Sequence, residues 1–325
     1  MAPQQPVKII LGTHQIGDAT LFPGIIHFTT KEQVTALLTA FKDRGYIDLD
    51  TARNYPGSES LLAAANAPLH FNIHTKILSG MPGAPLVPAW HSRDAIAASI
   101  SASLKNLCVD SVETMFLHVP DRDTPLTETL RAINEAYAKG QFKKFGISNY
   151  MAKEVEEMLD ICEREGLVKP SVFEGHYNAA CRSGEEELFP LLRKHGVSFW
   201  AYSPAAGGFF SDQRQDSPRW DDKTVVGQLY QKLYGSEAVQ ASVSAVRAAA
   251  SAHGISPHAA ALRWTIFHST LDGSYGDGVT FGMSKIEQLH QTLDAIDAGP
   301  LPDDVAEKIS GICATFEGTG PAYHL

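Results

Sequence analysis

Short apolar runs alternate with longer amphipathic stretches along most of the chain. The short runs are rich in β-branched and aromatic residues and end at turn residues, which predicts strands buried on both faces. These strands are expected at about residues 7–13, 45–50, 71–77, 112–118, 142–148, 171–176, 197–202 and 278–282. Helical periodicity predicts helices at about residues 31–44, 58–66, 91–106, 126–139, 151–165, 185–195 and 285–297. The alternation predicts the α/β class and a closed parallel (β/α)₈ (TIM) barrel.

Turn and capping signals mark the ends of several of these helices. Thr30 is followed three residues later by Gln33, which is the spacing of a capping box at a helix start. Gly45, Gly140 and Gly166 each come directly after a helical stretch, where glycine commonly ends a helix. These signals support the predicted order of strands and helices.

The main alternative architecture is an open, doubly wound sheet. A nucleotide-binding sheet of that kind would carry a glycine-rich phosphate loop after an early strand, and the sequence contains neither GxGxxG nor GxxxxGK. We found no convincing internal repeat, and no linker rich in Pro, Gly or Ser divides the chain. We therefore predict a single barrel domain over residues 1–325.

One segment, residues 207–234, interrupts the regular alternation after the seventh predicted strand. It is long, rich in aspartate and carries aromatic residues, and long loops in compact domains usually serve function. We interpret it as a lid loop over the mouth of the barrel. The alternative is a plain surface insertion, which loops tolerate well.

Composition limits the partners of the chain. Its 325 residues suffice for one such barrel, and its net charge of −10 disfavours binding to nucleic acid. The four cysteines are scattered without a CxxC pair, as is typical of a reducing compartment. We find no secretory signal and no run of about 18 apolar residues, so we expect a cytoplasmic protein that does not span a membrane.

Candidate chemistry lies at the carboxyl ends of the strands, where barrel enzymes place their active sites. Asp50, Lys76 and His118 end three successive predicted strands, and Tyr55 follows shortly after Asp50. Tyrosine has a pKa of about 10, and a nearby ammonium favours the phenolate and lowers that pKa. We therefore interpret Tyr55 as a proton donor tuned by Lys76. Asp50 would hold the ammonium, and His118 would hydrogen-bond a carbonyl oxygen.

Each of these residues also has a purely structural interpretation. Asp50 could cap the next segment, Lys76 could be a solvated charge, and His118 could be a core histidine with its hydrogen bonds satisfied. Four such residues at three successive strand ends favour the functional interpretation. The sequence offers no metal site that would polarise the carbonyl oxygen instead.

These residues resemble motifs of the aldo-keto reductase family, most closely its aflatoxin-aldehyde reductase subgroup. The similarity runs from about residue 10 to the end, and the motifs are specific in combination and order. The family matches are Asp50-Thr51-Ala52-Arg53-Asn54-Tyr55, Thr75-Lys76, Leu117-His118, Gly146-Ile147-Ser148-Asn149-Tyr150, Tyr202-Ser203-Pro204 with Gly207-Gly208, and Gly282-Met283-Ser284. The subgroup matches are Gly12-Thr13, LHVPDRDTPLTETLRA, ELFPLLRKHG, AALRWTIFHS and GMSKIEQLHQT.

The resemblance implies a barrel enzyme that reduces a small-molecule aldehyde or ketone with NADPH, by hydride transfer and protonation from Tyr55. It implies that Ser148 and Asn149 hold the nicotinamide carboxamide and that Tyr202 stacks on the ring. The implied cofactor contacts further along the chain are Ser203, Pro204, Gly207, Gly208 and Gln213 around the pyrophosphate, and Gly282, Ser284, Gln288, Gln291 and Thr292 at the adenosine end. Lys285 or Arg219 could bind the 2′-phosphate, or either could be a solvated surface cation.

The chain departs from the family pattern at several positions. Glu174 replaces the Gln that contacts the carboxamide, and an ionised carboxylate accepts a hydrogen bond but cannot donate one. Within the subgroup's motifs, Ser203 replaces Asn, Gln213 replaces Lys and Thr292 replaces Asn. The last residues lack the Arg with which the subgroup binds acidic substrates. An aromatic substrate pocket is expected instead, from His14, Trp220, Tyr230 and Tyr234, although these side chains could equally be packing residues.

Two other functions remain open from the sequence. Lys76 could form a Schiff base with a carbonyl substrate, as in barrel aldolases, although a nicotinamide site would then have no use. The chain could also bind the cofactor as a non-enzymatic subunit of a channel, because fold alone does not fix function. A homodimer is expected only by analogy with the family.

Overall fold

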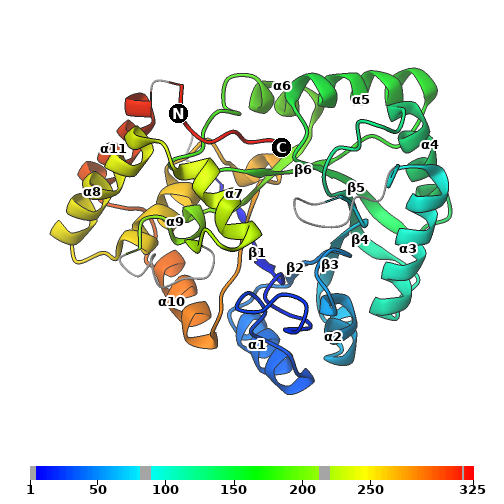
Figure 1. Cartoon of the computed structure of the whole chain (residues 1–325), viewed down its shortest axis with the longest axis horizontal. Coiled ribbons are helices and arrows are strands. Elements are labelled where there is room, and N and C mark those ends of the chain that lie inside the picture. The colour runs from blue at the N-terminus through cyan, green and yellow to red at the C-terminus, as the bar shows by residue number, and fades with distance from the viewer. Residues whose placement is uncertain (1–4, 81–88, 212–219, 317) are drawn as a thin grey trace.

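The computed structural model describes residues 5–80, 89–211, 220–316 and 318–325. Eight strands alternate with helices that surround them (Figure 1). The strands are β1 (Lys8–Gly12), β2 (Asp48–Asp50), β3 (Asn72–Lys76), β4 (Val112–Leu117), β5 (Phe142–Ser148), β6 (Val172–His176), β7 (Ser198–Tyr202) and β8 (Gly278–Phe281). The helices are α1 (Lys31–Asp43), α2 (Ser58–Ala64), α3 (Arg93–Leu107), α4 (Leu126–Ala138), α5 (Ala152–Glu165), α6 (Leu188–His195), α7 (Val225–Tyr234), α8 (Glu237–Ala252), α9 (Pro257–Phe267), α10 (Ile286–Asp297) and α11 (Asp303–Ser310).

The strands form one closed parallel barrel in the order β1 to β8, and β8 pairs with β1 to complete the ring. All eight predicted strands and all seven predicted helices are confirmed, with boundaries that differ by a few residues at most. Thr30 forms the expected capping box with Gln33, and Gly166 ends α5 in the left-handed conformation. The sequence-based prediction of a (β/α)₈ barrel is therefore confirmed.

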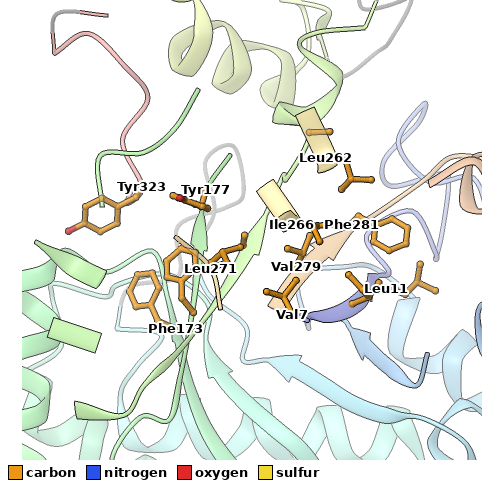
Figure 2. Packing of buried hydrophobic residues seen from close by; sticks show 14 of the residues in the cluster. Val7, Leu11, Phe173, Tyr177, Leu262, Ile266, Leu271, Val279, Phe281 and Tyr323 are labelled. Atoms are coloured by element: carbon orange, nitrogen blue, oxygen red, sulfur yellow. The ribbon is translucent and has the colours of Figure 1, made fainter. Parts of the chain in front are cut away.

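The main apolar core lies between the outside of the strands and the helices. Figure 2 shows Leu262 and Ile266 of α9 packed against Val279 and Phe281 of β8, and all four side chains are almost fully buried. Alternate residues of a strand point to opposite faces, so one set of strand residues fills this outer layer and the other set fills the barrel interior. The interior holds a separate apolar layer made of Ile10, Phe116, Val172 and Trp200.

The chain between β7 and β8 is more helical than the sequence pattern predicted. Residues 225–234, the second part of the expected lid loop, form α7, so the loop is shorter than predicted. Thr224 caps this helix by accepting a hydrogen bond from the backbone N–H of Gly227. Of the proposed loop, residues 212–219 lie outside the described part of the chain.

Helices α8 and α9 were not predicted at all. Both begin at a capping serine, Ser236 or Ser256, whose side chain accepts a backbone hydrogen bond from the first turn. Helix α8 is rich in alanine, which has high helix propensity but gives little contrast between apolar and polar positions. Most residues of α9 are buried, so its sequence shows no polar face.

None of the helices in the described residues has the length and apolar character needed to cross a lipid bilayer.

Candidate active site

Three ionisable side chains meet inside the barrel at the carboxyl ends of the strands. Asp50 ends β2, Lys76 ends β3, and Glu174 lies in β6. Lys76 forms ion pairs with Asp50 and with Glu174, whose Oε2 lies 3.3 Å from the ammonium nitrogen. The exposed fraction of each of these side chains is 5% or less. The predicted pairing of Lys76 with Asp50 is present, and Glu174 adds a second carboxylate to it.

The charge of Lys76 is maintained by these carboxylates. Burial alone lowers the pKa of a lysine because it penalises the ammonium. Here Asp50 and Glu174 outweigh burial and raise the pKa of Lys76 above its ordinary value. The ammonium also donates a hydrogen bond to the backbone carbonyl of Thr51, at 3.3 Å. Lys76 is therefore a fixed positive charge in the barrel mouth.

Tyr55 lies in the loop after β2, close to this charge. Its ring centroid is 5.7 Å from the Lys76 Nζ, 4.8 Å from the ring of His14 and 6.0 Å from the ring of His118. The loop is tied to the barrel, since the Arg53 N–H donates to the Lys76 carbonyl at 3.0 Å. The residues predicted as the catalytic group thus lie together.

The loop position also depends on a close approach at Gly17. Its φ is +148°, and a Cβ atom there would lie 2.0 Å from the Pro56 carbonyl oxygen. The neighbouring Asp18 N–H donates to that same carbonyl at 2.8 Å. A glycine in the β1–α1 loop therefore lets the backbone after Tyr55 pack directly against it.

The pKa of Tyr55 differs from the sequence-based expectation. Burial raises it above 10, and the carboxylates of Asp50 and Glu174 raise it further. The Lys76 ammonium lowers it, as expected, but does not outweigh these effects. The expected net lowering is therefore wrong, mainly because the sequence did not reveal how deeply the phenol is buried, and secondly because two carboxylates share the ammonium. Tyr55 is a neutral phenol at ordinary pH, with a proton to give.

His118 is a neutral imidazole at the end of β4. Burial, together with the charges of Lys76 and His14, lowers its pKa well below 6.5. Its Nδ1 lies 3.3 Å from Asn54 Oδ1, an atom that also accepts from the Ser79 N–H. Because the Asn54 amide nitrogen donates to the Ser79 carbonyl, the amide orientation is fixed and the His118 Nδ1 carries the proton. Nε2 is then an acceptor, so donating to a carbonyl oxygen would require a tautomer change or a second proton.

Hydrogen bonds through Asn149 join the ends of three strands, β4, β5 and β7. The Asn149 amide nitrogen donates to the His118 carbonyl and to Ser148 Oγ, both at 2.9 Å, and its oxygen accepts from the Tyr202 hydroxyl at 2.8 Å. Asn149 has a φ of 69°, a left-handed conformation that Asn adopts more readily than most residues. His176 stacks on one face of the Tyr202 ring, with centroids 5.3 Å apart.

Two backbone features nearby suit the anionic parts of a dinucleotide. Ser203, Ala206, Gly207 and Gly208 all have positive φ values, in the loop that follows β7. Such turns bring successive backbone N–H groups together and form anion-binding concavities. The second feature is the start of α10, where the N-cap residue, Lys285, makes no side-chain capping hydrogen bond to the first turn.

The other implied cofactor residues differ in whether their side chains are exposed or buried. Gly282, Ser284, Gln288 and Gln291 are exposed or half-buried around the start of α10, whereas Thr292 lies on the buried side of that helix. Ser284 N–H donates to Gln288 at 2.8 Å. Pro204 accepts a hydrogen bond from Thr265 through its carbonyl, at 2.8 Å. Gln213 and Arg219 lie outside the described residues.

Of the four aromatic residues expected in a substrate pocket, His14 lies beside Tyr55. The other three, Trp220, Tyr230 and Tyr234, form one aromatic cluster with Phe209. Tyr234 is fully buried and its hydroxyl hydrogen-bonds His176 at 2.6 Å. Tyr230 meets Ser203 Oγ at 3.0 Å. The packing alternative accounts for Tyr234, since a fully buried side chain has no free surface for a substrate.

Two contributors to the site were not predicted. Asn54 orients His118, and its position directly before Tyr55 was the available signal. The second is the last residue of the chain, since the Leu325 N–H donates to the Asn149 carbonyl at 3.2 Å and Arg122 donates to the Leu325 carbonyl at 3.0 Å. Sequence gives no signal for this contact, which joins distant segments. Within the described ranges, no group of three or more His, Cys, Asp or Glu side chains is arranged to hold a metal ion.

Comparison with known proteins gives concordant matches. The model of the aldo/keto reductase family matches residues 8–314. An aldo-keto reductase of Pseudocercospora fijiensis is 38% identical over 83% of this chain and 94% of its own length. Oxidoreductase sirO of Leptosphaeria maculans is 34% identical over 99% of this chain and 98% of its own length. Human aflatoxin B1 aldehyde reductase member 2 is 35% identical over 94% of this chain and 86% of its own length.

Proposed function

Because the chain belongs to the aldo/keto reductase family, an oxidoreductase family that reduces carbonyl groups, we propose that it reduces an aldehyde or ketone with NADPH and that Tyr55 is the proton donor. The observation that carries this proposal is the buried Lys76 ammonium, which is paired with Asp50 and lies 5.7 Å from the Tyr55 ring. A fixed positive charge stabilises the phenolate that remains after the proton has left.

The residues around the barrel mouth fit a nicotinamide dinucleotide. Ser148 and Asn149 would hold the carboxamide, and the Tyr202 ring would lie against the nicotinamide. The backbone of Gly207 and Gly208 would face the pyrophosphate. Lys285 at the start of α10 supports NADPH over NADH, because its ammonium would attract the additional 2′-phosphate. The bound cofactor supplies the hydride that the protein side chains cannot.

Tyr55 supplies the proton to the substrate oxygen. Its O–H bond breaks, the electron pair stays on the phenolate oxygen, and the Lys76 ammonium lies nearby to stabilise that negative charge. Asp50 keeps the ammonium in place. His118 and His14 flank the Tyr55 ring and limit the directions from which a carbonyl can approach it. The proposal of a lid over residues 207–234 stays open for its described part, which includes helix α7, while residues 212–219 lie outside the described residues.

A Schiff-base mechanism at Lys76 receives less support from the same geometry. A nucleophilic lysine must be unprotonated, which requires a lowered pKa. The two carboxylates raise the pKa of Lys76 instead. The same cation that suits proton donation by Tyr55 is therefore unsuited to attack on a carbonyl carbon.

The test is steady-state oxidation of NADPH with an aromatic aldehyde. Tyr55→Phe should lower kcat by about 10²–10⁴-fold, the usual contribution of a general acid, while NADPH binding measured by fluorescence quenching is retained. Tyr46→Phe is a matched control, because Tyr46 precedes β2 at the opposite end of the barrel and stacks on Phe41. Wild-type kcat in Tyr55→Phe would refute the assignment. The same assay with NADH should give a higher KM than with NADPH.

A further inference from the structure

If every carboxyl group were ionised, the barrel mouth would hold more negative than positive charge. Asp50 and Glu174 together would carry two negative charges, and Lys76 supplies one positive charge. All three side chains are at least 95% buried, since their exposed fractions are 3%, 5% and 1%. A buried net charge is costly, and proteins commonly remove it by leaving a proton on one of the carboxyl groups.

The two carboxyl groups are not equivalent. Asp50 accepts a direct hydrogen bond from the Lys76 ammonium. Glu174 Oε2 is 3.3 Å from the same nitrogen but makes no hydrogen bond within the described residues, and its other polar neighbour, Asp50, is a carboxyl group that raises the pKa of Glu174. A carboxylate that lacks donors gains least from being ionised. Glu174 is therefore the group on which the extra proton rests.

The pKa directions agree with this choice. Burial first, and then the charge of Asp50, raise the pKa of Glu174 to about 8, while Lys76 lowers it only in part. Three other titratable groups face Glu174: Lys76 from β3, Tyr202 from β7 and Tyr55 from the β2–α2 loop. The pKa of each is raised above its ordinary value. His176 follows on the same strand face, and burial lowers its pKa to about 4.

The register partners of Glu174 carry no charge. They are Ser148 of β5 and Trp200 of β7. Loss of a proton from Glu174 would therefore place a second full negative charge beside Lys76, and no second cation of the described residues pairs with Glu174 to offset it.

We propose that Glu174 is a positioning residue that holds one proton beside Lys76, and that the loss of this proton sets the alkaline limit of carbonyl reduction. This inference rests on the proposed function of Tyr55. While Glu174 is neutral, Asp50 is the one carboxylate that offsets the Lys76 charge, and the ammonium stabilises the Tyr55 phenolate. When Glu174 ionises, its charge opposes the phenolate and proton donation becomes less favourable. The proton on Glu174 stays in place during each reduction.

The first test compares the pH profile of kcat in the wild-type enzyme, Glu174→Gln and Glu59→Gln. Glu174→Gln has the shape of a protonated glutamate and cannot ionise. Glu59 is a matched buried glutamate in α2 that bonds Thr75 and Asn106 instead of Lys76. Wild-type kcat should fall up to about tenfold as Glu174 ionises, which is the effect of one pKa unit at Tyr55. Glu59→Gln should fall in the same way, and Glu174→Gln should keep its kcat to higher pH.

The second test needs neither cofactor nor turnover. Infrared difference spectra of the cofactor-free protein between about pH 6 and about pH 10 should show loss of the carbonyl stretch of a protonated carboxylic acid. The band should be present in the wild type and in Glu59→Gln and absent from Glu174→Gln. Circular dichroism checks that each variant is folded. If Glu174→Gln does not fold, the wild-type spectrum alone tests the inference, because absence of the carboxylic acid band at low pH would refute it.

The outcomes separate the two proposals. An enzyme without turnover at any pH would overturn the proposed function, while the infrared band would still report on Glu174. An active enzyme whose alkaline fall persists unchanged in Glu174→Gln would overturn this inference and leave the proposed function intact.

Discussion

The two ends of the barrel interior contain similar polar residues in different surroundings. Strand β2 contributes Asp48 to one end and Asp50 to the other, and β3 contributes His74 and Lys76 in the same way. At the first end, Asp48 accepts hydrogen bonds from His74 at 3.0 Å, Lys8 at 3.2 Å and Asn72 at 3.1 Å. One carboxylate there has three donors, whereas at the mouth two carboxyl groups share one ammonium.

This difference in donors reverses the effect on the carboxyl pKa. Burial raises the pKa at both ends. For Asp48, the hydrogen bond and charge of His74, with Lys8 and Asn72, outweigh burial and lower the pKa to about 2. For Glu174, burial and Asp50 prevail and the pKa rises to about 8. Burial alone therefore does not determine the ionisation of a barrel carboxyl group, because the number of donors facing it decides the direction.

The apolar layer separates these two clusters. Lys8 Nζ lies 5.7 Å from the Trp200 ring on one side, and Lys76 Nζ lies 5.6 Å from the Phe116 ring on the other. The two rings contact each other, with centroids 5.8 Å apart. The charge of Asp50 still acts on His74, but no hydrogen bond or ion pair among the described residues joins the two clusters, so the cluster around Asp48 serves as a nearby reference for the active-site cluster.

The largest effect is expected from a mutation that removes the cation of the cluster at the barrel mouth. Lys76→Met would leave two buried carboxyl groups without a cation and Tyr55 without its stabilising charge. We expect kcat to fall by about 10³-fold or more and the free energy of unfolding to fall by about 3–5 kcal/mol, the usual cost of breaking a buried ion pair. Denaturant titration and steady-state kinetics measure the two effects. A folded variant with nearly wild-type kcat would contradict the role given to the ammonium.

A mutation at the other end should separate stability from activity. Asp48→Asn removes a charged acceptor that has three donors, and should lower the free energy of unfolding by about 2–3 kcal/mol. Because the folded pKa of Asp48 is about 2, below the ordinary 3.8, its stabilisation is present above pH 3.8 and lost as pH falls toward 2. The difference between variant and wild type should shrink over that range. A loss of kcat as large as in Lys76→Met would show that the cluster around Asp48 is no reference for the active-site cluster.

The smallest expected effect sharpens the comparison. The folded pKa of Glu174, about 8, lies above its ordinary 4.5, so its contribution to stability is present below pH 4.5 and lost as pH rises toward 8. Relative to wild type, Glu174→Gln should therefore gain at least about 1.4 kcal/mol in the free energy of unfolding across this range, the equivalent of one pKa unit. Urea titrations across this range measure the gain. A constant difference would indicate that Glu174 does not change its protonation there.

Much of the fold followed from the sequence, because strands buried on both faces read as short apolar runs. The group of Asp50, Tyr55, Lys76 and His118 was also predictable, because parallel strands deliver their carboxyl ends to one side. Helices α8 and α9 gave a weaker signal, since the many alanines of α8 reduce the contrast between its faces and most residues of α9 are buried. The aromatic character of Trp220 and Tyr234 does not tell from the sequence whether their side chains line a pocket or pack in a core.

The contact of Glu174 with Lys76 could not be inferred from the chain. It crosses the barrel between β3 and β6, which are not neighbours, so no strand pairing fixes it. The predicted direction of the Tyr55 pKa was wrong mainly because the sequence does not show how deeply the phenol is buried. The charge of Glu174, which the sequence-based interpretation did not count, adds a smaller increase.

The pairing of β8 with β1 has a consequence for biosynthesis. Lys8 aligns with Gly278, so the ring cannot close until nearly the whole chain has left the ribosome. Until then, the outer edges of the first and seventh strands lack partners, and unpaired edges are prone to associate with other chains. Slow steps in translation after β7, or loss of the last strand, should therefore favour aggregation of nascent protein more strongly than changes in any surface helix.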